Sequence, residues 1–182
     1  MKPVIETHDL CKSYNGRTVV DHLNLTVPQG CVYGFLGPNG AGKSTTMNMI
    51  TGFIEPSSGR ILVDGNDISK KPKKAKKQIG YMPEGVPLYN NLTVKEFVTY
   101  MAELKGVNSK EVKEKVKTVI EDIGITDVQN KLTRNLSRGY KQRVSMAGAL
   151  VGEPKILILD EPTVGLDPKQ IIEIRQLIKE LG

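Results

Sequence analysis

The feature that most constrains the fold of this chain is a glycine-rich segment that runs from Gly37 to Thr45. Its sequence satisfies the pattern G-x-x-x-x-G-K-[ST] at every fixed position. Phosphate is a crowded anion, and only a backbone with few side chains can wrap it with converging N–H groups, which explains the glycines. An apolar stretch precedes the segment and a helical pattern follows it, as this motif demands. The segment therefore predicts a phosphate-binding loop rather than a chance glycine-rich turn.

The nucleotide contacts expected from this loop involve nine consecutive residues: Gly37, Pro38, Asn39, Gly40, Ala41, Gly42, Lys43, Ser44 and Thr45. The helix that begins at Lys43 directs about half a positive charge towards the same place. Lys43 adds a mobile cation for the β- and γ-phosphates, which makes it a candidate catalytic residue as well. Ser44 offers its hydroxyl to Mg²⁺. The loop thus predicts binding of a magnesium–nucleotide complex.

A pair of acids supplies the second part of the predicted site. The apolar run Ile156–Leu159 is typical of a buried strand, and Asp160 and Glu161 follow it directly. Open α/β sheets bind ligands at the carboxyl ends of their strands, so Asp160 is a candidate Mg²⁺ ligand, through water. Glu161 is then placed to polarise an attacking water as general base. On its own the segment could equally be a strand end with solvated acids; the phosphate-binding loop favours the catalytic interpretation.

The pattern of the remaining chain favours an α/β fold. Helical patterns cover Lys43–Ile50 and begin at Thr93 with a capping box to Glu96, at Ser109 as cap, at Arg138, and after the cap Asp167. The patterns at Thr93 and Ser109 each carry an apolar stripe at helical spacing, which we interpret as core packing. Strand patterns cover Val4–Leu10, Val19–Val27, Cys31–Leu36, Arg60–Val63 and Ile156–Leu159. Alternating strands and helices imply a mostly parallel sheet, and the helical middle is an insertion. We expect subdomains at 1–84 (β subdomain and phosphate loop), 85–137 (inserted helices) and 138–182 (the rest of the core).

Composition narrows the function classes. No apolar run approaches the ~20 residues that span a bilayer, so a membrane role requires a partner. Cys11 and Cys31 have no metal-binding spacing and are interpreted as buried structural thiols. The net charge of +6 is concentrated in lysines between Lys70 and Lys77, which we interpret as a solvated face, so no nucleic-acid partner is expected.

The segment before the acidic strand identifies a family resemblance. Leu136, Ser137 and Gly139 are similar to the L-S-G-G-Q signature of ABC-type ATPases, and the resemblance covers essentially the whole chain. It implies a P-loop NTPase fold of the RecA/ABC type, with a mostly parallel core sheet, an N-terminal antiparallel β subdomain and an inserted helical subdomain. It further implies that Ser137 and Gly139 grip the ATP γ-phosphate held by a second subunit, that Tyr14 stacks on adenine, and that Asp167 belongs to a loop crossing the dimer interface.

Three departures from the family pattern qualify this resemblance. Glu84 stands where most members have a glutamine that contacts Mg²⁺, and we expect it to be a metal ligand with a catalytic role. Arg138 and Tyr140 replace the signature's second glycine and its glutamine, a form that resembles the subfamily serving drug- or polymer-exporting partners. The family's sensor histidine follows a later strand, whereas this chain stops at Gly182. We therefore expect a C-terminally truncated core with two unpaired strand edges, unstable or aggregating by itself.

The resemblance implies a cytoplasmic ATPase on the inner face of the membrane. It would work with ATP and Mg²⁺ as a head-to-tail dimer with a second ATP-binding subunit and drive a separate transmembrane permease, as an exporter. Two alternatives remain open at this point: a soluble ABC-type ATPase acting on ribosomes or DNA, and a nucleotide-binding module without hydrolysis. The transported substrate does not follow from the sequence.

Overall fold

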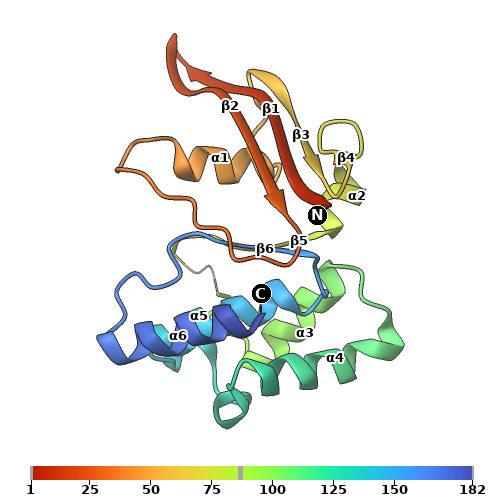
Figure 1. The fold of residues 1–182 in the computed structure, drawn as a ribbon. Helices are drawn as coiled ribbons and strands as arrows, with labels where there is room; N and C mark the ends of the chain where they lie inside the picture. The colour runs from red at the N-terminus through yellow and green to blue at the C-terminus, as the bar shows by residue number, and fades with distance from the viewer. Residues whose placement is uncertain (1, 86–87, 182) are drawn as a thin grey trace. The chain divides into compact units, whose positions relative to one another are not determined.

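The computed structural model describes residues 2–85 and 88–181 (Figure 1). Contacts within the chain divide it into two compact units, one ending at Ile79 and the other spanning Gly80–Leu181. The glycine-rich segment belongs to the first unit. The two acids after the last strand belong to the second. The subdomain boundaries expected at residues 84 and 137 stay a prediction.

An antiparallel sheet dominates the first unit. In the described part of that unit it has the order β2-β1-β3-β4, and every neighbouring pair is antiparallel. The hairpin between β1 and β2 turns at Asn15 and Gly16, whose φ angles of 48° and 79° suit a two-residue turn with both residues left-handed. The predicted strands at the N-terminus and at Arg60–Val63 are confirmed and extend further than expected. The bounds are β1 (Pro3–Tyr14), β2 (Arg17–Pro28), β3 (Ser58–Val63) and β4 (Asn66–Asp67).

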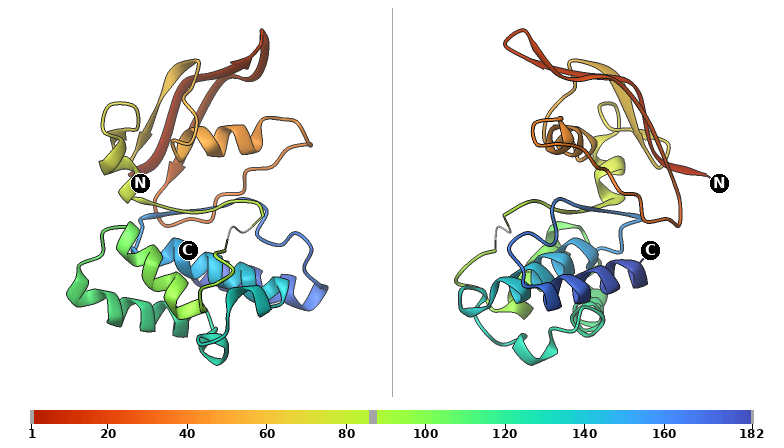
Figure 2. Two further views of the ribbon diagram at one scale, coloured as in Figure 1. Left: turned by 180° about the vertical axis from the view of Figure 1, so that it is seen from behind. Right: turned by 60° about the vertical axis from the view of Figure 1, so that its left-hand side comes forward.

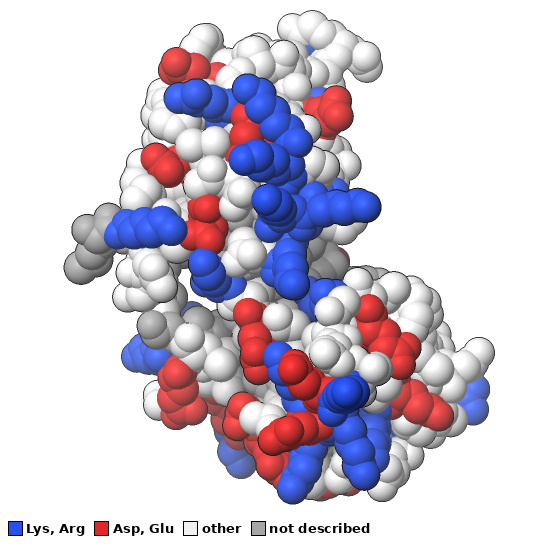
Figure 3. Space-filling view, turned by 90° about the vertical axis from the view of Figure 1, so that its right-hand side faces the viewer, with Lys and Arg blue, Asp and Glu red and all other residues white. Residues whose placement is uncertain are grey.

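Two helices accompany this sheet. Helix α1 (Lys43–Ile50) has the predicted bounds, and Figure 2 shows it lying across one face of the sheet, in contact with β2 and β3. Helix α2 (Pro72–Lys77) carries four of the clustered lysines, and Figure 3 shows lysine and arginine gathered on this side of the first unit. All six lysines between Lys70 and Lys77 are exposed, as predicted. Lys76 also makes a hydrogen bond: its Nζ donates to the Gly52 carbonyl at 2.9 Å and links α2 to the end of α1.

The predicted strand Cys31–Leu36 is wrong. This segment has no regular secondary structure, and Val32, Tyr33 and Leu36 are 60%, 49% and 91% exposed. The physical reason is that a strand is stabilised by hydrogen bonds to a neighbour, and this segment belongs to no sheet of the described chain. Cys31 is consequently exposed, which corrects its interpretation as a buried thiol, whereas Cys11 is buried as expected.

The second unit is mainly helical, and in both views of Figure 2 its helices lie on one side of the β5–β6 pair. Its core is apolar and includes Phe97, Val98, Val116, Ile123 and Met146. The two predicted apolar stripes therefore pack inward, apart from Leu104, which is 63% exposed. Its elements are β5 (Ile79–Met82), α3 (Val94–Leu104), α4 (Ser109–Asp122), two short 3₁₀ turns (Thr126–Val128 and Thr133–Asn135), α5 (Arg138–Leu150), β6 (Ile156–Leu159) and α6 (Pro168–Leu181).

Local capping residues determine where helices α3 and α4 begin. The capping box between Thr93 and Glu96 is formed in both directions at the start of α3, as predicted. Helix α4 is instead capped by Asn108, whose side chain accepts from the Lys110 N–H, and Ser109 is the first helical residue. Both residue types are good caps, and the amide oxygen one position earlier fills the role.

Candidate functional site

Glycine geometry shapes the predicted phosphate-binding loop. Gly40 and Gly42 both have φ of 82°, a left-handed conformation that favours glycine. A Cβ on Gly42 would lie 2.7 Å from the Val19 carbonyl oxygen of β2, so only glycine fits there. Lys43 Nζ donates to the carbonyl oxygens of Gly37 and Pro38 at 2.8 and 3.0 Å. The lysine ammonium therefore lies over the loop that the sequence assigns to phosphate.

The N-terminus of α1 is directed at the same loop. Its N-cap is Gly42, and no side chain caps the first turn. Ser44 is exposed, and Thr45 is partly buried. The neighbouring Thr46, which the sequence did not single out, is buried and donates its hydroxyl to the Gly42 carbonyl at 2.9 Å. Uncapped N–H groups and a helix dipole form a site suited to an anion.

Tyr14 ends β1 beside the hairpin turn and is 45% exposed. Lys12 Nζ lies 5.1 Å from its ring centroid, close enough for a cation–π contact. The ring is therefore available at the surface of the first unit. Its stacking on adenine stays a prediction.

The acids of the second unit extend from paired strands. The Asp160 N–H donates to the Met82 carbonyl at 2.9 Å, so the residues after β5 and β6 leave the sheet at the same end. Asp160 is 7% exposed, whereas Glu84, two residues after β5, is exposed. Burial, and then the negative charge of Asp160, raise the pKa of Tyr81. Two carboxylates thus lie at one edge, as the predicted metal site requires.

Glu161 has an unusual backbone. Its φ is 49°, a left-handed conformation that costs about 1–2 kcal/mol for a residue with a Cβ. The residue is exposed and directly follows the buried Asp160. Such strain at a polar residue is typical of functional positions. This geometry supports the predicted general base, whose role stays a prediction.

The signature segment forms the N-terminus of α5. The Ser137 hydroxyl accepts from the Tyr140 N–H, so Ser137 is the N-cap. Gly139 is buried, and a Cβ there would lie 3.0 Å from the Gln170 side chain. Asp167 caps α6 by accepting from the Gln170 N–H at 2.9 Å. Gln170 therefore joins Gly139 to the loop that holds Asp167.

Several contacts around the signature did not follow from the sequence. A Cβ on Gly165 would collide with the guanidinium of Arg138, so the arginine that replaces a family glycine packs on this turn. Gln142 Nε2 donates to the Val164 carbonyl at 3.3 Å. A pocket of about 200 Å³ lies beside the start of α5 and is lined by Gly124, Ser137, Gly139, Tyr140, Arg143, Gln170, Glu173 and Ile174. These links come from residues distant in sequence, which single positions in a motif do not reveal.

The predicted site residues fall into two groups. Tyr14 and residues 37–45 lie in the first unit, and Glu84, Ser137, Gly139, Asp160, Glu161 and Asp167 lie in the second. The hydroxyl of Ser44 and the carboxylates of Asp160 and Glu84 are hard oxygen donors, the chemistry that Mg²⁺ prefers. The donor set therefore fits the predicted metal, and the joint site stays a prediction.

No helix among the described residues has both the length and the apolar character needed to cross a bilayer.

Comparison with known proteins shows what the chain resembles. The family profile described as ABC transporter matches residues 20–164. The bacitracin transport ATP-binding protein BcrA of Bacillus licheniformis is 44% identical over 182 residues, which are 100% of this chain and 58% of that protein. The lipopolysaccharide export system ATP-binding protein LptB of Haemophilus influenzae is 38% identical over 98% of this chain and 75% of its own length.

A solved structure shows the same fold. It is cbiO1 from Clostridium perfringens, described as part of the ABC transporter complex cbiONQ, with 35% identity and a TM-score of 0.87 over 100% of this chain and 74% of that one. The predicted α/β P-loop fold, with its antiparallel β part and helical insertion, is thereby confirmed. The chain spans 58% of the length of BcrA.

Proposed function

Because the chain belongs to the ABC transporter family, we propose that it is the ATP-binding and ATP-hydrolysing subunit that powers a separate membrane-spanning exporter. The observation that carries the proposal is the glycine loop, in which Lys43 Nζ lies over two loop carbonyls at the uncapped start of α1. The names of the relatives, which include bacitracin transport and lipopolysaccharide export, support an exporter.

In the proposed mechanism each group has one role. The loop N–H groups and Lys43 bind the β- and γ-phosphates and stabilise the charge that develops during phosphoryl transfer. Ser44, Asp160 and Glu84 would hold Mg²⁺, which neutralises phosphate charge when bound. Glu161 accepts a proton from the attacking water.

The second nucleotide-gripping group comes from another subunit. Ser137 and the α5 N-terminus expose a hydroxyl and a helix dipole, which suit the γ-phosphate of ATP on a partner. We infer a head-to-tail dimer that closes on two ATP molecules and reopens after hydrolysis. Asp167 and Gly165 belong to the loop that would cross this interface. The dimer would sit on the inner face of the membrane through its permease.

The Glu161→Gln variant tests this proposal. In the full-length protein the amide keeps the shape of the side chain but removes the base, so ATP binds, hydrolysis stops and a closed dimer accumulates with MgATP. Size-exclusion chromatography with light scattering measures the dimer, and phosphate release measures hydrolysis. Glu114→Gln, the same substitution at an exposed position of α4, is the matched control and should behave as wild type.

The outcomes separate the alternatives. A Glu161→Gln protein that hydrolyses at the normal rate would place the general base elsewhere. ATP binding without phosphate release in the wild type would favour a non-hydrolysing module, and activity dependent on ribosomes or DNA would favour the soluble class.

For residues 1–182 alone we expect weak hydrolysis, because the segment 31–36 before the loop is not held in a strand.

A further inference from the structure

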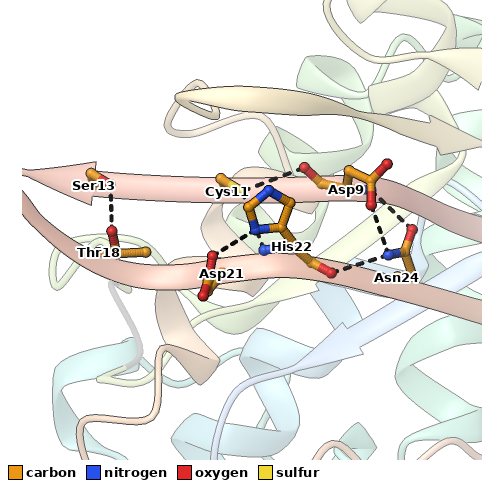
Figure 4. A network of polar contacts seen from close by, with 7 residues as sticks. All are labelled: Asp9, Cys11, Ser13, Thr18, Asp21, His22 and Asn24. Carbon is orange, nitrogen blue, oxygen red and sulfur yellow. Dashed lines mark hydrogen bonds and ion pairs between the residues drawn. The ribbon is translucent and has the colours of Figure 1, made fainter.

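A second group of ligating side chains lies on the β1–β2 hairpin, outside the phosphate loop. The Sγ of Cys11, a carboxylate oxygen of Asp21 and a ring nitrogen of His22 all lie within 4.8 Å of one another. His22 Nδ1 is 2.7 Å from Asp21 Oδ1. The backbone N–H of His22 donates to Cys11 Sγ at 3.2 Å. Figure 4 shows the three side chains together.

A β-bulge explains how adjacent residues converge. The register pairs Leu10 with Leu23 and Lys12 with Val20, so Asp21 and His22 on β2 together oppose the single residue Cys11 on β1. In a regular strand neighbouring side chains point to opposite faces. The bulge, with His22 at a φ of 41°, breaks this alternation and directs both side chains towards the thiol.

A second layer of hydrogen bonds holds the bulge. Asn24 Nδ2 donates to Asp9 Oδ1 at 3.0 Å and to the His22 carbonyl at 3.1 Å. The Asp9 N–H donates to Asn24 Oδ1 at 2.9 Å, and the Cys11 thiol donates to the Asp9 carbonyl at 3.5 Å. Asp9 and Asn24 thus connect the two strands beside the trio (Figure 4). Hydrogen bonds of this kind orient the side chains that bind the metal directly in metal sites.

We propose that Cys11, Asp21 and His22 bind one Zn²⁺ ion, with water as the fourth ligand. Thiolate, imidazole and carboxylate are the ligand types that zinc takes, and bonds of ~2.0–2.3 Å hold tetrahedral ligands roughly 3.5 Å apart. The three ligand atoms lie within 4.8 Å of one another and the His22–Asp21 pair is 2.7 Å apart, so side-chain rotations would bring them to this spacing. Solvent reaches it, because the Asp21 and His22 side chains are 77% and 72% exposed. Binding replaces the His22–Asp21 hydrogen bond and releases the thiol proton to water. Linear spacing did not reveal this set because its members come from two strands.

Cobalt binding to the reduced, nucleotide-free full-length protein tests the site. Co²⁺ bound to a thiolate in a tetrahedral site gives a charge-transfer band and visible d–d bands, and Zn²⁺ should abolish both at one equivalent. We expect Cys11→Ser to remove the charge-transfer band and His22→Ala to weaken binding at least tenfold. Cys31→Ser and His8→Ala change the other cysteine and histidine of this sequence and should bind as wild type.

A further measurement guards against misfolding of the buried Cys11 variant. Asp21 and His22 are exposed, so Asp21→Asn and His22→Ala should keep the wild-type circular dichroism while losing the zinc-induced rise in Tm. Absence of a thiolate–cobalt band in the wild type, its persistence in Cys11→Ser, or its equal loss in Cys31→Ser would overturn the proposal.

Discussion

The contact between Arg138 and Gly165 makes a quantitative prediction for Gly165→Ala. Gly165 has a φ of 68°, and an added Cβ would meet the Arg138 guanidinium. The left-handed backbone costs alanine about 1–2 kcal/mol. Displacing a packed side chain costs about 1–3 kcal/mol more. For Arg138 we take the lower end of this range, because the end of an arginine side chain is flexible. We therefore expect Gly165→Ala to lower the free energy of unfolding by about 2–3 kcal/mol, the sum of these costs.

A double-mutant cycle separates the two costs. In an Arg138→Ala background the collision is gone, so Gly165→Ala should cost only the ~1–2 kcal/mol of backbone strain. The interaction energy should then be about 1 kcal/mol. Gly106→Ala is the matched control, because Gly106 has a φ of 73° and nothing within 4 Å of its Cβ position. Its cost should be the same in both backgrounds.

Urea unfolding followed by far-UV circular dichroism measures these differences, since the sequence contains no Trp. If Gly165→Ala cost the same with and without Arg138, the arginine would not pack on this turn. If it cost no more than ordinary surface changes, the left-handed backbone itself would be wrong.

Three further predictions concern the loop and the helices. Lys43→Ala should weaken ATP binding by about 2–5 kcal/mol in a fluorescence titration, because two phosphates lose a charged donor; Lys77→Ala, on the solvated face of α2, should bind normally, and unchanged affinity in Lys43→Ala would contradict the loop assignment. Thr93→Ala should lower stability by about 1 kcal/mol through loss of the α3 cap, measured by thermal unfolding; no change would mean that the cap contributes nothing. The hydrogen bonds from the backbone and side chain of Thr93 lower the pKa of Glu96 below its ordinary 4.5, so its contribution to stability is present above that value and is lost as the pH falls through the folded-state pKa. The Tm of Glu96→Gln should therefore vary less with pH in this acidic range than that of the wild type, and identical profiles would contradict the argument.

Sequence reasoning succeeded where the determinants are local. The bounds of α1, the strand before Asp160, the capping box at Thr93 and the cap at Asp167 all follow from a few consecutive residues. A cap or a glycine loop needs only its immediate neighbours to form. These signals are therefore readable without knowing the fold.

It failed where the structure depends on distant partners. The segment Cys31–Leu36 has the composition of a buried strand, but its state depends on neighbours that its own residues do not specify. The bulge that brings Cys11 and His22 together depends on the register between two strands. A slip of one residue in that register would turn every side chain of the strand to the opposite face. The packing of Arg138 on Gly165 joins residues whose types alone do not suggest contact.

The left-handed backbone of Glu161 sets a conflict between the stability of the backbone and the general-base role proposed for this side chain. Glycine would relax the strain there, but it lacks the carboxylate that the proposed mechanism uses to accept a proton from water. Under selection for thermal tolerance alone, residue 161 would drift towards glycine or asparagine; under selection for turnover it would remain acidic. Sequence libraries randomised at this codon, sorted once for heat resistance and once for ATP consumption, should consequently enrich different amino acids.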